Sequence, residues 1–221
     1  VSKMTTIQIN EQIEQGSDAW FLMKLGKISG SRIADLLSEG RGGKESLTKK
    51  KYRNELIRER LTGKRIPSYK TPLMHRGIEL EPLARTAYEH KFKTMVDQIA
   101  FVDHPTIAMA GCSPDGLIGA DGLLEIKCPS PENHLDNYLN DGVQLDQYYD
   151  QVQWQLVCTQ RKWCHLISFD PELPEYLQIY CKEITLDEEW KERAESAVIA
   201  FNAEIETILT NLKELNYGNN A

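Results

Sequence analysis

The chain has 221 residues, enough for one sizeable core, and its 41% hydrophobic and 27% charged content is ordinary for a globular protein. We expect a single domain over residues 1–221, a cytoplasmic setting and no membrane partner, because no apolar run could span a bilayer and no signal segment opens the sequence. Its five cysteines form no C-x-x-C pair, which argues against a disulfide framework or a zinc knuckle. The net charge of −7 excludes a uniformly basic surface but not a local basic channel.

The first part of the sequence predicts helices. They are expected over residues 19–23, 29–39, 49–62 and 72–92. Ser17 is expected to cap the first helix, and Thr48 the third, which Gly63 would stop. Pro82 lies inside the fourth helix and predicts a kink or a break there.

The pattern then changes to short apolar or alternating segments. Strands are predicted over residues 99–103, 107–112, 116–118, 123–127, 162–169 and 176–184. A helix is predicted over 143–159, and Thr185 to Glu188 is a capping box that would open a long C-terminal helix with one apolar stripe. This order predicts an α/β (α+β) fold with a mixed central sheet flanked by helices.

The most informative segment runs from Gly111 to Pro129 and contains Pro114-Asp115 followed by Glu125-Ile126-Lys127. Glu125 and Lys127 are two residues apart on a predicted strand, so their side chains point to one face. The Ile126 side chain points to the other face, but its carbonyl lies between the two polar side chains.

The length of the preceding hairpin loop decides where Asp115 points. A two-residue loop, Asp121-Gly122, would pair Asp115 with Cys128 and turn Asp115 to the opposite face. A three-residue loop over 120–122 would pair Asp115 with Lys127 and gather all three polar side chains on one face. We therefore predict the three-residue loop, with Gly122 at positive φ as its left-handed residue.

Two carboxylates and a lysine on one sheet face are costly to bury unless they are paired or bound to a metal. Hard oxygen ligands favour Mg²⁺, with Mn²⁺ as an alternative ion. Taken singly, Ser-Pro-Asp-Gly is also a good turn sequence, and Glu-Ile-Lys is also an ordinary strand with a same-face ion pair. Together, at the spacing P-D-x₉-E-x-K, they indicate metal-assisted phosphoryl chemistry.

This combination resembles the PD-(D/E)XK nuclease signature, and the likeness extends to the phage lambda exonuclease family, which includes YqaJ-type viral recombinase nucleases. The matching pieces recur in the family's order from about Gln15 to the C-terminal helix. They are Asp18-Ala-Trp20, Leu25-Gly26, Ser31, Cys112-Ser-Pro-Asp-Gly-Leu117, Glu125-Ile-Lys-Cys-Pro129 and Gln151-Val-Gln153. The resemblance implies a type II restriction-endonuclease-like mixed sheet.

The resemblance also implies an activity and partners. The family degrades one strand of duplex DNA from its 5′ end with Mg²⁺, by two-metal-type hydrolysis, and releases 5′-mononucleotides. It assembles as a homotrimer around DNA ends and works with a single-strand annealing protein in phage recombination. The residues that match the family's functional positions fall into four groups. They are the metal ligands Asp115, Glu125 and the Ile126 carbonyl; the catalytic Lys127, Gln151 and Glu81; the 5′-phosphate ligands Lys24, Ser31 and Ser113; and the DNA-binding Arg41.

Some positions depart from the family pattern or stay ambiguous. Lys24 replaces the usual arginine, and Asn133, beside His134, replaces another basic residue of the phosphate pocket. Glu79 competes with Glu81 for the additional acidic position.

Three other functions stay open on the sequence alone. They are another PD-(D/E)XK endonuclease, a catalytically silent DNA-binding ring, and a hydrolase of free nucleotides, for which no glycine-rich phosphate loop is present.

Overall fold

The computed structural model describes residues 13–67, 69 and 71–218. The helices are α1 (Asp18–Lys24), α2 (Ile33–Leu37), α3 (Leu47–Thr62), α4 (Pro72–Phe92), α5 (Pro131–Leu139), α6 (Tyr149–Thr159) and α7 (Glu188–Gly218). The strands are β1 (Ile28–Ser29), β2 (Val96–Asp97), β3 (Val102–Asp103), β4 (Ala110–Cys112), β5 (Gly116–Ile118), β6 (Gly122–Lys127), β7 (Trp163–Phe169) and β8 (Ile179–Thr185). The 3₁₀ helices are η1 (Gly30–Arg32), η2 (Arg41–Gly43), η3 (Val143–Tyr148) and η4 (Glu175–Leu177). No helix in these ranges is both long and apolar enough to cross a membrane.

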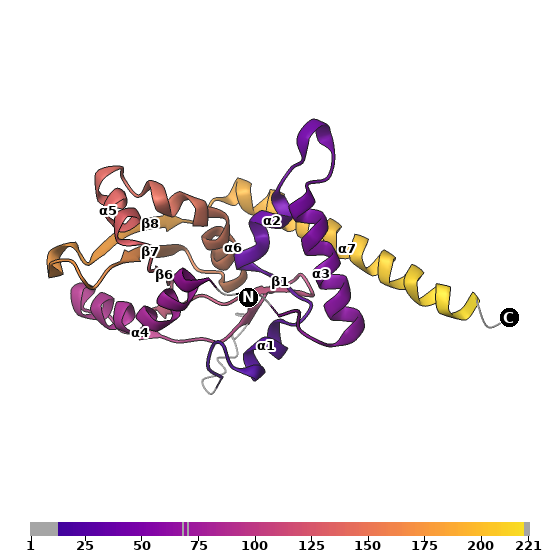
Figure 1. Cartoon of the computed structure of the whole chain (residues 1–221), viewed down its shortest axis with the longest axis horizontal. Coiled ribbons are helices and arrows are strands. Elements are labelled where there is room, and N and C mark those ends of the chain that lie inside the picture. The colour runs from indigo at the N-terminus through magenta and orange to yellow at the C-terminus, as the bar shows by residue number, and fades with distance from the viewer. Residues whose placement is uncertain (1–12, 68, 70, 219–221) are drawn as a thin grey trace, which may run out of the picture.

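The main sheet has the strand order β2-β5-β6-β7-β8. The central pair, β6 and β7, is parallel, and the other pairs are antiparallel. A mixed sheet flanked by helices was predicted, and the structure confirms it (Figure 1). A parallel pair needs a long crossover, and here α5, η3 and α6 provide it between β6 and β7.

Side chains alternate along β6, so its two faces pack against different helices. Leu124 and Ile126 belong to an apolar cluster with Ala84 and Tyr88 of α4. Leu123 points the other way, into the larger cluster that includes the inner face of α6. The sheet is therefore a middle layer, and the odd-numbered residues of β6 face α6.

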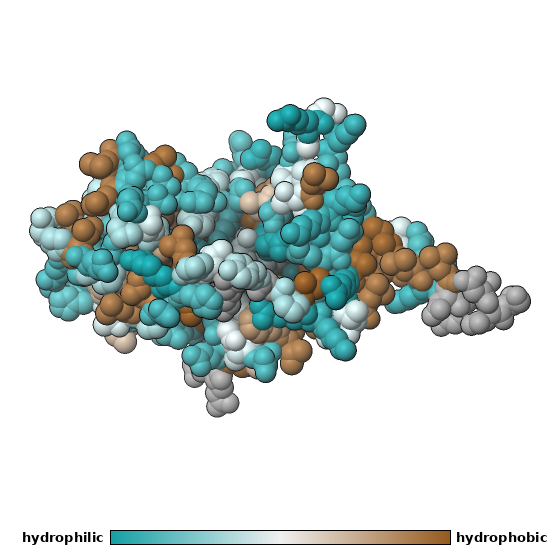
Figure 2. Space-filling view, viewed as in Figure 1, coloured by the Kyte–Doolittle hydropathy of each residue, from teal (hydrophilic) through white to brown (hydrophobic). Residues whose placement is uncertain are grey.

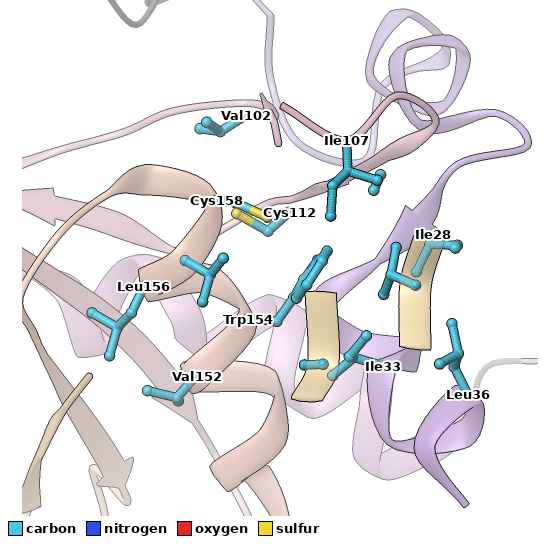
Figure 3. Close-up of a cluster of buried hydrophobic side chains, with 14 of the residues drawn as sticks. Ile28, Ile33, Leu36, Val102, Ile107, Cys112, Val152, Trp154, Leu156 and Cys158 are labelled. Carbon is cyan, nitrogen blue, oxygen red and sulfur yellow. The ribbon is translucent and has the colours of Figure 1, made fainter. Parts of the chain in front are cut away.

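A second, three-stranded sheet has the order β1-β4-β3 and holds the N-terminal helices against the body. Trp154 of α6 is fully buried beside it and donates a hydrogen bond to the Gly111 carbonyl. Figure 3 shows this indole surrounded by aliphatic side chains from several elements, with Cys112 and Cys158 nearby as free thiols. This cluster fixes α6, which carries several polar site residues, against β4.

The long α7 packs along the N-terminal helices, and its end projects from the body (Figure 1). Ala194, Val198, Phe201 and Ile205 form the buried stripe that the sequence predicted. The helix begins at Glu188, and the Asp187 side chain just before it accepts from the Trp190 amide as the cap, so the predicted cap at Thr185 is wrong. Thr185 is unavailable as a cap because it pairs with Trp163 at the end of β8.

Three other local predictions differ from the structure. The helix expected over 29–39 is divided, because Ser29 joins β1 and pairs with β4 before η1 and α2 begin. Ser46, not Thr48, caps α3, while Gly63 ends it in the left-handed conformation as predicted. Pro82 does not break α4; Pro82 and Ile78 are both exposed, so the carbonyl deprived of an amide partner can be hydrated.

Candidate active site

The hairpin between β5 and β6 gathers the predicted polar side chains on one face. Leu117 pairs with Leu123 and Ile118 with Gly122, so the loop is 119–121 and Asp115 lies opposite Glu125. The predicted register, with Asp115 opposite Lys127, is wrong by two residues. A shift of two preserves the alternation of faces, so the predicted shared face is correct.

The predicted conformation of Gly122 is also wrong. Positive φ occurs at Gly119 (φ 52°), which begins the turn. Gly122 lies in the strand, and a Cβ there would approach the Trp163 ring to 2.3 Å. This glycine is therefore required for close packing against Trp163 and not for a left-handed turn.

Asp115 immediately precedes β5, and its side chain bonds to β6 beyond the last backbone pair of the two strands. Its Oδ2 accepts a hydrogen bond of 2.7 Å from the backbone amide of Ile126. The amide and carbonyl of a strand residue point to the same side, so the Ile126 carbonyl also faces Asp115. Burial, followed by the nearby carboxylates of Glu125 and Glu81, raises the pKa of Asp115 well above its usual range. A cation beside Asp115 would reverse this effect.

Glu125 is 2% exposed and is held at both carboxylate oxygens. Oε1 accepts from Lys127 Nζ at 2.6 Å and from Gln151 Nε2 at 2.5 Å. Oε2 accepts from Gln155 Nε2 at 2.7 Å. The carboxylate is thus buried with three hydrogen-bond donors, which compensates for the loss of water.

The Lys127 ammonium is fixed by its surroundings. It lies 4.4 Å from the centroid of the Tyr148 ring and 3.5 Å from Gln151 Oε1. Burial lowers the pKa of Lys127, but the carboxylates of Glu125 and Asp115 outweigh burial, and the net shift is upward. Lys127 is therefore a fixed positive charge beside the two carboxylates.

Glu81 of α4 is the third carboxylate of this site. It is half-buried and lines the same cavity, whereas Glu79 is exposed and does not, which favours Glu81 for the additional acidic position. Arg85 lies one turn further along α4 and pairs with Glu81 at 2.5 Å. Burial raises the pKa of Glu81, and Arg85 opposes that rise.

These groups line one cavity of about 600 Å³. It is lined by Asp115, Glu125, Ile126, Lys127, Gln151 and Glu81, and also by Lys24, Ser31 and Ser113. The structure therefore brings the predicted metal, catalytic and phosphate-binding residues together. Leu73, Met74 and Ile78 of α4 form an apolar wall on one side.

The predicted phosphate-binding residues come from three N-terminal and central segments. Lys24 ends α1, with its Nζ 4.0 Å from the centroid of the Trp20 ring. The Trp20 indole N–H is shared between the Ala100 carbonyl at 2.8 Å and Ser113 Oγ at 2.9 Å, so it contacts that hydroxyl. Ser31, in η1, is exposed on the cavity wall. Burial and repulsion from Arg65 lower the pKa of Lys24 to about 8.

Asn133 and His134 are adjacent in the sequence, but only Asn133 lines the cavity. Asn133 lines the cavity, where the family pattern predicts a basic residue. His134 is fully buried elsewhere, with Nδ1 2.7 Å from Ser168 Oγ and Nε2 2.9 Å from the Leu177 carbonyl. Both ring nitrogens are engaged outside the cavity, so His134 does not take part in the pocket.

Arg41 is not part of the cavity lining. It lies in η2, exposed, in the loop between α2 and α3 that projects from the body in Figure 1. Seen from the same side in Figure 2, this projection is mostly hydrophilic. Gly42 and Gly43 follow Arg41 at positive φ, and no described atom lies within 4 Å of where a Cβ would be, so backbone conformation and not crowding favours glycine at both positions.

The donor set suits a hard divalent cation. Mg²⁺ is usually held by one or two carboxylates and keeps several waters. Asp115, Glu125 and the Ile126 carbonyl supply such a set. Among the residues that the structure describes, no three carboxylate, imidazole or thiol side chains are placed to hold a metal by themselves. A cation held here would therefore need the backbone carbonyl and water as additional ligands.

Sequence reasoning missed three residues that support this arrangement. Gln155 and Arg85 contact carboxylates of the cavity directly. Arg76 of α4 donates to the Pro129 carbonyl at 2.7 Å and pairs with the buried Asp170, which fixes the chain just after Lys127. Gln155 could have been found, because it follows Gln151 by four residues on a predicted helix and so shares its face.

A mixed sheet with Asp115, Glu125 and Lys127 on one face defines a protein of the PD-(D/E)XK nuclease fold. Solved structures agree. The alkaline exonuclease LHK-Exo from Laribacter hongkongensis is 37% identical, with a TM-score of 0.83 over 91% of this chain and 99% of that chain, and the same values hold for its complex with dAMP. A phage related exonuclease from Haemophilus somnus 129PT is 13% identical and shares the fold, with a TM-score of 0.69 over 84% of this chain and 96% of that one.

The family follows from the sequence profile of the YqaJ-like viral recombinase domain, which matches residues 19–162. The chain belongs to this family, and the predicted family is confirmed. No curated protein sequence matches the chain.

Proposed function

We propose that the protein is a Mg²⁺-dependent exodeoxyribonuclease that degrades one strand of duplex DNA from its 5′ end and releases 5′-mononucleotides. The observation that carries this proposal is the convergence of Asp115, Glu125 and Lys127 in one cavity of a chain of this family. The related alkaline exonuclease forms a complex with dAMP, a nucleotide of the product class proposed here.

Asp115, Glu125 and the Ile126 carbonyl would hold the metal, which supplies Lewis-acid activation of the phosphoryl group and of a water nucleophile. Lys127, fixed against Glu125, orients the attacking water and offsets the charge that develops on the phosphoryl oxygens. Glu81 adds a third carboxylate, and two-metal-type hydrolysis is our preferred mechanism for that reason.

The polarity rests on the position of the phosphate-binding residues. Lys24, Ser31 and Ser113 share the cavity with the catalytic groups, so a terminal 5′-phosphate can be bound while the next linkage is cut. Release of a 5′-mononucleotide leaves a new 5′-phosphate on the shortened strand. Each cycle therefore regenerates the ligand of the pocket and favours movement in one direction.

The wider setting is proposed from family membership. We expect a cytoplasmic homotrimer that encloses duplex DNA ends, with Arg41 on the projecting loop in contact with the DNA. We also expect a single-strand annealing protein as partner in phage-type recombination, because the family is that of viral recombinases.

The test is digestion of linear duplexes labelled at the 5′ or the 3′ end, with closed circular DNA as control, in Mg²⁺, in Mn²⁺ and in chelator. We expect metal-dependent release of 5′-mononucleotides from the 5′ end and no cutting of closed circles. Cleavage of the circles would indicate an endonuclease. Binding of DNA ends without nucleotide release in either metal would indicate a DNA-binding ring without catalysis, and both outcomes would overturn the proposal.

A further inference from the structure

Two glutamines of α6 clamp the Glu125 carboxylate. Gln151 and Gln155 are four residues apart, so they lie on the same face of the helix. Gln151 Nε2 donates to Oε1 of Glu125 at 2.5 Å, and Gln155 Nε2 donates to Oε2 at 2.7 Å. Each carboxylate oxygen thus has an amide donor from the same rigid element.

Gln155 has a feature that a purely structural residue would not need. It is 1% exposed, and its Oε1 has no hydrogen-bond partner among the described residues. An ionised carboxylate only accepts hydrogen bonds, so the amide must present Nε2 to Glu125 and leave Oε1 facing away. Burial of an unpaired acceptor is unfavourable, and an apolar side chain here would avoid it.

We propose that Gln155 is a positioning residue that fixes Glu125 for metal binding and thereby sets the affinity of the site for its divalent cation. This inference rests on the proposed function, in which Glu125 is a metal ligand. Lys127 and Gln151 both act on Oε1, so Gln155 is the donor that holds Oε2 and restrains rotation of the carboxylate about its terminal bond.

Gln153, on the same helix, is a matched control. It is also buried and also hydrogen-bonded, but its amide donates to the Thr185 carbonyl and accepts from the Asp187 amide. It does not line the cavity. Gln153→Met therefore removes a buried amide of the same size from α6 without altering Glu125.

The experiment measures Mn²⁺ binding by titration calorimetry with the metal-free, DNA-free protein. Gln155→Met keeps the volume but removes the donor, and we expect its dissociation constant to rise roughly 10–100-fold, the usual effect of losing a residue that orients a metal ligand. Gln153→Met should stay within about twofold of wild type. Gln155→Asn, which keeps the amide but shortens the side chain, is a second variant with the same expected direction.

An unchanged dissociation constant in both Gln155 variants, or an equal rise in Gln153→Met, would overturn the inference. In nucleotide release, Gln155→Met should need more Mg²⁺ but approach the wild-type rate at saturation. A wild type whose Mn²⁺ affinity depends on Gln155 but which digests no DNA would refute the proposed function and leave this inference standing. A wild type that digests DNA, with Mn²⁺ affinity independent of Gln155, would refute the inference alone.

Discussion

The Lys24 ammonium should make the preference for 5′-phosphorylated ends depend on pH. Burial, reinforced by repulsion from Arg65, lowers the pKa of Lys24 to about 8. A lysine with this pKa is about 90% protonated near pH 7 and about 10% protonated near pH 9. A terminal phosphate has its second pKa at about 6, so the ligand keeps its charge over this range while the pocket loses its own.

The size of the effect follows from one charge-assisted contact. Such a hydrogen bond contributes about 1.5–3 kcal/mol, and screening at the half-buried Lys24 favours the lower end. Because about 1.4 kcal/mol corresponds to a factor of ten, we expect a preference of roughly tenfold near pH 7. With about a tenth of the enzyme still protonated near pH 9, the preference should fall to roughly twofold.

The assay compares initial rates at low DNA concentration on matched duplexes with a 5′-phosphate or a 5′-hydroxyl. Under these conditions the rate reports kcat/KM and so the pKa of the free enzyme. Lys24→Arg is the control, because a guanidinium stays charged and its preference should not change over this pH range. A wild-type ratio as flat as that of Lys24→Arg would refute the pKa argument. Equal wild-type rates on both ends near pH 7 would refute the pocket itself.

The remaining predictions concern catalysis, packing and assembly. Lys127→Ala should abolish nucleotide release and leave DNA binding near wild type, because affinity comes mainly from distributed phosphate contacts. Near-normal nucleotide release by this variant would exclude the role given to Lys127. Gly122→Ala should lower the free energy of unfolding by about 1–3 kcal/mol in denaturant titration, because the new Cβ meets the Trp163 ring, whereas Gly119→Ala, strained only by its φ, should lose less. Light scattering should give the mass of three 25.3 kDa chains, and a monomer at working concentration would contradict the trimer.

The shared face of the catalytic residues could be predicted because it depends only on parity. The prediction assigned the left-handed residue to Gly122, although Gly119 has that conformation, and the register moved by two residues as a result. Local turn propensities did not separate these glycines. The difference is tertiary, since Trp163 comes from β7, about 40 residues further along the chain, and leaves no space for a side chain at position 122.

The errors elsewhere share this origin. Ser29 fits the start of a helix in the sequence, but in the structure it pairs with β4, which lies some 80 residues later in the sequence. Thr185 fits the pattern of a helix cap in the sequence, but in the structure it is the last residue of β8. His134 lies beside Asn133 in the sequence, but its ring joins α5 to β7 and stays outside the pocket. Periodicity predicts which residues share an element, whereas these outcomes depend on which distant segment arrives beside them.

The β5–β6 hairpin also constrains where relatives of this protein can vary in length. Residues 119–121 are unpaired, so a longer loop there leaves Asp115 opposite Glu125 whether the added number is even or odd. One residue added inside the paired strands, over 116–118 or 122–124, would instead turn Asp115 toward α4 unless a β-bulge restores the alternation. Length differences among relatives should therefore collect in the loop, and any single-residue change within the paired strands should coincide with a bulge.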